Sequence, residues 1–287
     1  MPVMATSSHR THAVQCLEVW GGNQAVDTSI SVPGIDAWVS CTPYRGDADG
    51  GDVYYLSMCG AGRISRFVLA DVCGHGTAAA KLGQLLRKLM RKHIRTLDQT
   101  VFARALNRGF SHLSRYGHFA TAVLATYFAP TNHLVTCNLG HPRPLWYRSA
   151  TATWDVLDYA ASDPTAAIRN LPLGIIEGTQ YRQFAVQLGE RDLVLLFTDA
   201  LIEARNPEGR MLGEDGLLAL VQRLPEDPPE TIGRSIVASV AAYRGGLPPN
   251  DDETLLVLHH NATNPPRQSL GEKLRVMARM LGLDLRQ

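Results

Sequence analysis

The chain has few cysteines, no long apolar run and little excess charge. Its five cysteines are scattered, odd in number and without a CxxC pair. This pattern argues against a disulfide framework or a zinc ribbon and is typical of reduced thiols in a cytoplasmic protein. No stretch approaches membrane-spanning length, and the N-terminus lacks a signal-peptide core. The formal net charge of +1 argues against nucleic-acid binding as the main task. We therefore expect a cytoplasmic protein that binds neither membranes nor nucleic acids.

Several common catalytic and binding motifs are also absent. The chain contains no P-loop, no HExxH and no Rossmann glycine fingerprint. A calcium loop that began at Asp47 would need glycine at its sixth position and a bidentate glutamate at its twelfth. Those positions hold Asp52 and Met58, so the calcium loop is excluded.

What the sequence does contain is an ordinary globular composition, with 45% hydrophobic and 19% charged residues over 287 positions. Strand and helix patterns alternate along it without a clear internal break. Strands are expected at 12–20, 36–44, 52–59, 66–71, 119–128, 134–140, 154–157, 181–186, 192–199 and 253–260. Helices are expected at 77–95, 99–113, 215–223 and 231–243. These elements predict an α+β sandwich, in which helices cover layers of β-sheet.

Aspartates recur at the ends of the expected strands. They are Asp52, Asp71, Asp199, Asp251 and Asp252. A carboxylate at the end of a buried strand is costly unless it meets a cation or caps the next helix. For any one of these residues, a structural role at a strand end or helix cap is an equal alternative. A group of them at one edge of a sheet would repel each other, and an all-oxygen set of this kind suits Mg²⁺ or Mn²⁺. The set as a whole therefore predicts a metal site.

Six ordered motifs carry a family resemblance across about residues 36 to 260. They are GGDVYYL, ADVCGHG, CNLGHPRPLWY, LPLG, LFTDALIEARNPEG and DDETLLVL. In this order they resemble the metal-dependent serine/threonine protein phosphatases of the PPM family, and in particular the bacterial branch typified by the sporulation phosphatase SpoIIE and the stress phosphatase RsbU. The resemblance implies an αββα sandwich, two antiparallel sheets flanked by helices, with a binuclear Mn²⁺ or Mg²⁺ site at one rim.

The resemblance also assigns roles at the expected site. It implies that Asp71 bridges two ions and that the backbone carbonyl of Val72 contacts one of them. Asp199 and Asp251 would hold the first ion, and Asp52 would support the second, partly through water. Asp252 is the alternative to Asp251, because the register of the paired acids is open. The catalytic carboxylates implied are Asp71, Asp199 and Asp251.

The chain departs from the family pattern at three positions. Ala200 follows Asp199 where relatives usually have glycine, so this turn must avoid positive φ or accept strain. Tyr55 stands where many relatives carry a second aspartate. Cys73 stands where eukaryotic members place a proposed acid histidine, which leaves His75 as a weak candidate acid that we expect to be structural.

Three further residues near the motifs have a functional and a simpler interpretation. His141 is expected to fix its loop by hydrogen bonding. Arg45 could bind a substrate phosphate or simply be solvated on its turn. Glu203 lies in a segment that relatives use as a switch, and the simpler alternative is an exposed helix acid.

The resemblance divides the chain into an N-terminal segment at 1–35, which we expect to pack on the domain or form part of it, a phosphatase domain at 36–262 and a C-terminal amphipathic helix at 263–287. In that helix Leu270, Leu274, Met277 and Leu281 form one apolar stripe. The stripe either packs on its own domain or joins two chains as a homodimer.

The function implied is hydrolysis of phosphoserine or phosphothreonine on a partner protein in a bacterial signalling pathway. In the family that partner is often a small anti-sigma-factor antagonist, within a sigma-factor partner-switching system. Two alternatives remain open: a pseudophosphatase that binds a phosphoprotein without catalysis, and an enzyme that acts on a small phosphoester. Retention of all four aspartate positions favours the enzyme, and Ala200 favours the binding module.

Overall fold

The computed structural model describes residues 11–14, 18–59, 62–74, 76–113, 117–158, 170–225 and 228–264. His75 and the four residues of the C-terminal apolar stripe lie outside these ranges. None of the helices within the ranges is both long and apolar enough to cross a membrane.

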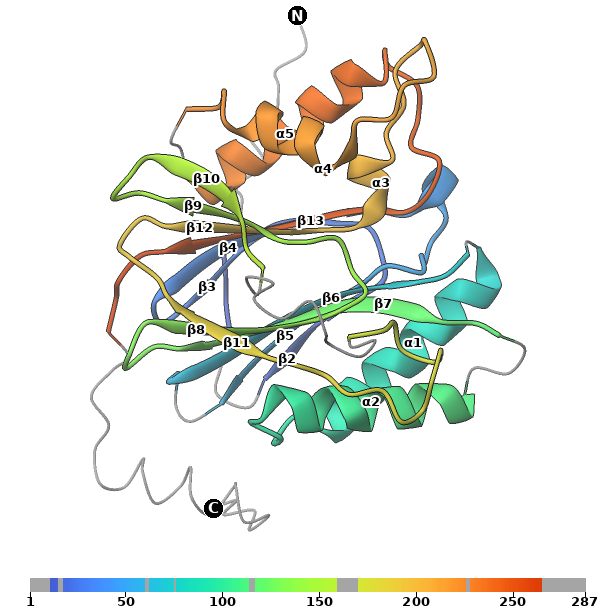
Figure 1. Ribbon diagram of the computed structural model, residues 1–287, viewed down its shortest axis with the longest axis vertical. Helices are drawn as coiled ribbons and strands as arrows, with labels where there is room; N and C mark the ends of the chain where they lie inside the picture. The colour runs from blue at the N-terminus through green and yellow to red at the C-terminus, as the bar shows by residue number, and fades with distance from the viewer. Residues whose placement is uncertain are drawn as a thin grey trace, which may run out of the picture.

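Two β-sheets face each other and form the centre of the molecule (Figure 1). The seven strands of sheet A, in spatial order, are β1 (His12–Ala13), β3 (Val26–Val32), β4 (Ile35–Thr42), β13 (Glu253–His260), β12 (Leu193–Phe197), β9 (Leu145–Arg148) and β10 (Thr153–Val156). The six strands of sheet B are β11 (Phe184–Gln187), β8 (His133–Leu139), β7 (Ala120–Phe128), β6 (Ile64–Val72), β5 (Val53–Cys59) and β2 (Val19–Gly22). Neighbouring strands are antiparallel except for the short β1–β3 pair.

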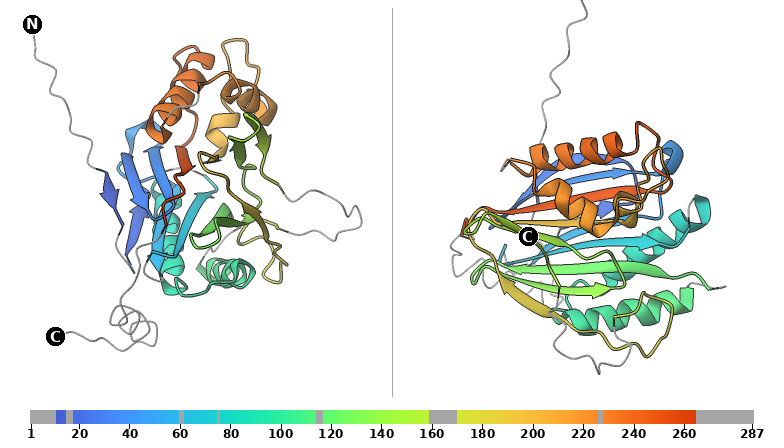
Figure 2. Two further views of the ribbon diagram at one scale, coloured as in Figure 1. Left: turned by 90° about the vertical axis from the view of Figure 1, so that its left-hand side faces the viewer. Right: turned by 45° about the horizontal axis from the view of Figure 1, so that its top comes forward.

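Helices cover the outer face of each sheet. Sheet B is covered by α1 (Thr77–Lys92) and α2 (Gln99–Leu113), and sheet A by α3 (Asp199–Ile202), α4 (Gly213–Val221) and α5 (Pro229–Tyr243). Figure 2 shows this order of layers from the side, with α4 and α5 on one surface and α1 and α2 on the other. The predicted αββα sandwich is confirmed.

Successive side chains along each strand point to opposite faces of the sheet. The hydrophobic core therefore has three layers: one between the two sheets and one between each sheet and its helices. In β6, Phe67 and Leu69 point between the sheets, whereas Val68 and Ala70 point toward α1 and α2. Strands buried on both faces explain why these segments read as continuous apolar runs in the sequence. The inner layer ends at one rim, where β6 leads into α1 and β12 leads into α3.

Some elements differ from the sequence-based expectation. The segment expected as one strand at 12–20 contains two described strands, β1 in sheet A and β2 in sheet B, and residues 15–17 lie outside the description. β3, β9 and the one-turn helix α3 were not predicted. β9 lies in a run with two prolines, and β3 has four polar or charged positions among its seven, so neither stands out as a strand.

Candidate metal centre

The strand register places the predicted acids on the inner side of the sandwich. In β6, Asp71 comes two residues after Leu69, so its side chain lies on the face that points between the sheets. Asp52, just before β5, is in the same phase as the inward residues Tyr54 and Leu56. The sequence thus directs both carboxylates to the rim of the inner layer.

Asp52 is the most deeply buried of these acids, at 1% exposed. Its Oδ2 accepts a hydrogen bond from the hydroxyl of Thr254 at 2.6 Å and another from the hydroxyl of Thr198 at 2.9 Å. Its Oδ1 is buried and has no hydrogen-bond partner among the described residues. Burial and the charge of nearby Asp71 raise the pKa of Asp52 well above its usual range. One oxygen is therefore fixed, and the other is left for a ligand.

Neighbouring carboxylates also raise the pKa values of Asp71 and Asp199. Burial, followed by the charges of Asp199 and Asp251, raises the pKa of Asp71 to about 8. Burial, followed by the charges of Glu203 and Asp251, raises the pKa of Asp199 to about 6. The carboxylates are therefore close enough to destabilise one another's ionised forms.

Asp252 has a different environment from Asp251. Its two oxygens accept the backbone N–H groups of Tyr44, at 2.6 Å, and Gly51, at 2.5 Å. Asp251 instead uses one oxygen to accept the N–H of Asp252 at 2.8 Å. Both oxygens of Asp252 thus accept hydrogen bonds from the loop that carries Asp52.

Two glycines allow this loop to approach its neighbours. A Cβ at Gly50 would lie 2.6 Å from an oxygen of Asp252, and a Cβ at Gly51 would lie 2.9 Å from the carbonyl oxygen of Val72. Any side chain would therefore push the loop away from the carboxylates and from Val72. This explains the Gly-Gly pair that precedes Asp52 in the sequence.

The residues present fit a divalent metal site by their chemistry. In the described part of the chain, no three His, Cys, Asp or Glu side chains are already arranged as ligands of one ion. The mutual repulsion of the acids and the unpartnered Oδ1 of Asp52 are nevertheless what a divalent cation would relieve. The donors are all oxygen atoms, as Mg²⁺ and Mn²⁺ prefer.

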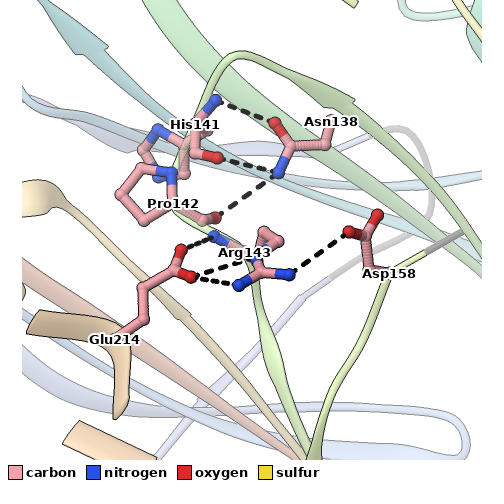
Figure 3. Close-up of polar contacts among 6 residues, drawn as sticks. All are labelled: Asn138, His141, Pro142, Arg143, Asp158 and Glu214. Carbon is pink, nitrogen blue, oxygen red and sulfur yellow. Dashed lines mark hydrogen bonds and ion pairs between the residues drawn. The ribbon is translucent and has the colours of Figure 1, made fainter. Parts of the chain in front are cut away.

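His141 supports this rim from the next strand pair. Its Nδ1 lies 2.7 Å from the hydroxyl of Thr121, which is directly opposite Asp71 across β6 and β7. Asn138 accepts the N–H of His141 and donates to its carbonyl (Figure 3). Burial lowers the pKa of His141 to about 3, so the ring is neutral. The expected loop-fixing role of His141 is confirmed.

The other candidates occupy less central positions. Tyr55 points toward α1 and α2, away from the acids. Ala200 lies inside α3 without a positive φ, so the missing glycine causes no backbone strain. Arg45 is exposed, has φ 53°, and stacks on the ring of Tyr44 at 4.9 Å. Glu203 is an exposed acid at the end of α3, although its charge reaches Asp199.

Three features near the rim were missed from the sequence. The hydroxyls of Thr198 and Thr254 donate hydrogen bonds to Asp52. Arg143 contacts Glu214 and so connects the loop before β9 to α4. Figure 3 shows Arg143 between Glu214, at 2.5 Å, and Asp158, at 3.6 Å. The threonines share the inward phase of Leu196 and Leu256, which is the one sequence signal that could have found them.

An apolar groove lies apart from the acidic rim. It has a volume of about 530 Å³ between α4 and α5 and is lined by apolar residues such as Leu212, Leu220 and Tyr243. No Asp or Glu occurs among its described lining residues. It therefore lacks the chemistry of the acidic rim.

Comparison with known proteins defines the class to which this fold and this rim belong. The sequence profile of the family described as Stage II sporulation protein E (SpoIIE) matches residues 62–261, which is more than half of the chain. The chain belongs to the SpoIIE family.

Two curated relatives come from Bacillus subtilis (strain 168). The phosphoserine phosphatase RsbP is 23% identical over 213 residues, which cover 72% of this chain and 48% of RsbP. The phosphoserine phosphatase RsbU is 25% identical over 191 residues, which cover 66% of this chain and 54% of RsbU. The chain thus spans about half the length of the curated relatives it matches.

Solved structures share the fold. The RsbU and RsbW domains of Rv1364c from Mycobacterium tuberculosis match with a TM-score of 0.69 and 24% identity, over 91% of this chain and 71% of that chain. The catalytic domain of the serine/threonine protein phosphatase PstP, in complex with two manganese ions, matches with a TM-score of 0.53 and 17% identity, over 78% of this chain and 97% of that chain.

Proposed function

We propose that this chain is a Mn²⁺- or Mg²⁺-dependent protein phosphatase that hydrolyses phosphoserine or phosphothreonine on a partner protein. The observation that carries the proposal is the convergence of Asp52, Asp71, Asp199 and Asp251 on one rim, where burial and the charges of neighbouring acids raise the pKa values of Asp52, Asp71 and Asp199. Membership of the SpoIIE family and the phosphatase activity of RsbP and RsbU support it.

Each acid then has a distinct task. Asp71 would bridge two ions, the Val72 carbonyl would contact one of them, Asp199 and Asp251 would hold the first, and Asp52 would support the second. Bound divalent ions supply the Lewis acidity that hydrolysis of a phosphate monoester requires at neutral pH.

The surrounding residues hold this arrangement in place. Thr198 and Thr254 orient Asp52 so that its Oδ1 stays available. Asp252 fixes the loop before Asp52 through the N–H groups of Gly51 and Tyr44. Such supporting contacts determine how well metal ligands are pre-oriented.

The proposed substrate is a phosphorylated protein, and the family resemblance points to a small anti-sigma-factor antagonist. The protein substrate separates this proposal from a small-molecule phosphoesterase, and turnover separates it from a pseudophosphatase that only binds.

The test uses chelator-treated protein and three kinds of substrate: an aryl phosphate, phosphopeptides and sugar phosphates. On addition of Mn²⁺, the protein should bind about two ions per chain, as calorimetry can measure, and should regain hydrolysis of p-nitrophenyl phosphate. Phosphoserine and phosphothreonine peptides should then be hydrolysed with a higher kcat/KM than sugar phosphates. Absence of both Mn²⁺ and Mg²⁺ binding would contradict the proposal, and binding of phosphopeptides without turnover would identify a pseudophosphatase.

A further inference from the structure

The loop between Leu173 and Thr179 presents two adjacent isoleucines to solvent. Ile175 is 48% exposed and Ile176 is 54% exposed. Burial of an isoleucine side chain stabilises a fold, so a loop that leaves both isoleucines half-exposed gives up part of that stabilisation. Neighbouring exposed apolar side chains of this kind mark interaction sites more often than isolated ones do.

A buried asparagine fixes these isoleucines in their outward position. Asn107, on α2, is 0% exposed. Its Oδ1 accepts the N–H of Gly174 at 2.8 Å, and its Nδ2 donates to the carbonyls of Ile176, at 2.8 Å, and Glu177, at 3.0 Å. The three bonds hold the backbone on both sides of the isoleucine pair, so the pair cannot turn inward while they persist.

Hydrogen bonds within the loop fix its backbone further. The hydroxyl and the N–H of Thr179 both donate to the carbonyl of Ile176, at 2.6 Å and 3.2 Å. A rigid presentation of apolar side chains lowers the conformational entropy lost on binding. The loop is therefore built to display the isoleucines.

The isoleucine pair lies close to the acidic rim. Leu173 exchanges two backbone hydrogen bonds with Ala120, at 3.0 Å and 2.7 Å, and Ala120 is paired with Val72, the residue after Asp71. The steps from Val72 to Ala120 and from Ala120 to Leu173 are each about 4.8 Å, the spacing of paired strands. Ile175 follows Leu173 by two residues, so its Cα lies within roughly 17 Å of the Val72 Cα. In Figure 1 this yellow segment runs beside α2, on the side of the molecule where β6 ends.

We propose that Ile175 and Ile176 form a docking surface for apolar side chains of the phosphoprotein substrate that flank its phosphoserine. This inference rests on the proposed phosphatase function. An extended peptide advances about 3.3 Å per residue, so residues within about five positions of the phosphoserine reach the isoleucine pair. Two half-exposed side chains fall far short of the ~1,200 Å² buried in a stable dimer, which favours a transient substrate over a second copy of the chain.

The experiment compares two phosphoserine peptides of equal length and charge with the Mn²⁺-loaded protein. One carries leucines within five residues of the phosphoserine, and the other carries serines there. The wild-type protein should hydrolyse the leucine peptide with a kcat/KM about tenfold higher, mainly through KM. Ile175→Ser/Ile176→Ser should remove this preference and leave hydrolysis of p-nitrophenyl phosphate and its Mn²⁺ dependence unchanged.

Two control variants separate docking from general surface effects. Leu97→Ser/Val101→Ser alters side chains of similar exposure, 47% and 44%, just before α2 and in its first turn, and it should keep the preference. Ile175→Val/Ile176→Val retains apolar side chains and should keep it as well.

The outcomes that overturn the inference differ from those that overturn the phosphatase function. Equal kcat/KM for the two peptides in the wild-type protein contradicts the docking surface, as does an equal loss of preference in Leu97→Ser/Val101→Ser. A lower molecular mass of Ile175→Ser/Ile176→Ser by light scattering assigns the surface to a second copy instead. Failure of the wild-type protein to hydrolyse p-nitrophenyl phosphate contradicts the proposed function itself.

Discussion

The hydroxyl of Thr254 donates a hydrogen bond of 2.6 Å to Oδ2 of Asp52. Thr254 is the second residue of β13 in sheet A, and Asp52 directly precedes β5 in sheet B. The contact joins the two sheets at the rim where the acids converge. Because Oδ2 is fixed in this way, the orientation of the buried carboxylate, and with it the direction of Oδ1, depends on a neutral residue that is 202 positions away in sequence.

Replacement of this hydroxyl should weaken metal binding more than folding. Thr254→Val keeps the shape of the side chain and removes the donor to Asp52. Loss of a residue that orients a metal ligand typically costs about 10- to 100-fold in metal affinity, so the Mn²⁺ concentration for half-maximal activity should rise about tenfold or more. Titration of activity with Mn²⁺ measures this, and Thr254→Ser, which retains the hydroxyl, should stay near wild type. An unchanged Mn²⁺ requirement in Thr254→Val would show that Thr254 does not orient Asp52.

The paired acids should respond to amide substitution in opposite ways. Asp251→Asn should abolish most activity while the metal-free fold keeps its stability, because Asn can still accept the N–H of Asp252. Asp252→Asn should lower the free energy of unfolding by about 1–3 kcal/mol, because its amide NH₂ would face a backbone N–H that the carboxylate now accepts. Urea denaturation in chelator and activity in Mn²⁺ measure the two effects. The reverse pattern would make Asp252 the metal ligand.

A buried ion pair anchors the strand that follows these acids. Arg244, just after α5, contacts Glu253 at the start of β13 at 2.6 Å, and both side chains are 7% exposed. Arg244→Met leaves the Glu253 charge buried and unpaired, which should cost about 3–5 kcal/mol of stability. The double variant Arg244→Met/Glu253→Met should recover most of this loss, as thermal and urea denaturation can measure. Equal stabilities of the single and double variants would show that the pair contributes nothing specific.

The layers of the fold could be predicted because the inner strands carry continuous apolar runs and the helices have clear 3.6-residue stripes. α2 begins and ends at the predicted residues, and β13 matches its predicted range. β3 could not be predicted, because the three consecutive polar residues Asp27, Thr28 and Ser29 interrupt the polar–apolar alternation and the strand has no long apolar run. Its burial depends on pairing with β4, which is a tertiary contact.

The acids of the site could be predicted from their positions at strand ends, whereas their supporting contacts could not. The separate environments of Asp251 and Asp252 depend on where the loop before Asp52 runs, and no local pattern encodes that path. The Asn107 contacts to the loop before Thr179 span about 70 residues and are likewise invisible to periodicity.

The metal-free protein should lose stability as the pH rises. The pKa values of Asp71, about 8, and Asp199, about 6, lie above the ~3.9 of aspartate in an unfolded chain. Between pH 4 and 8 the folded protein therefore holds protons that the unfolded chain has released, so stability decreases through this window. Thermal melts in chelator from pH 5 to 8 should show a falling Tm, and saturating Mg²⁺ should flatten the decline. A Tm that rises over this range in chelator would contradict the clustering of these carboxylates.

Asp71→Asn tests whether the central acid is a metal bridge or only a structural residue near the end of β6. Asp71 does not cap α1, because it lies within β6 and the N-cap residue of α1 is Gly76. A carboxylate with only a structural role would tolerate replacement by asparagine with turnover intact. A bridging carboxylate has no substitute in a neutral amide. The variant should therefore lose most activity at every Mn²⁺ concentration, while its metal-free fold is as stable as wild type or more so, because repulsion with Asp199 and Asp251 is relieved.

Asp98 provides the matched control, since its Oδ1 accepts the N–H groups of Thr100 and Val101 at the start of α2 and thus makes it a true cap. Asp98→Asn should keep wild-type turnover and nearly wild-type stability. The measurements are turnover against Mn²⁺ concentration and thermal melts with and without chelator. If Asp71→Asn behaves like Asp98→Asn in both, Asp71 has only a structural role, and the assignment of the acidic rim as a phosphatase centre is wrong.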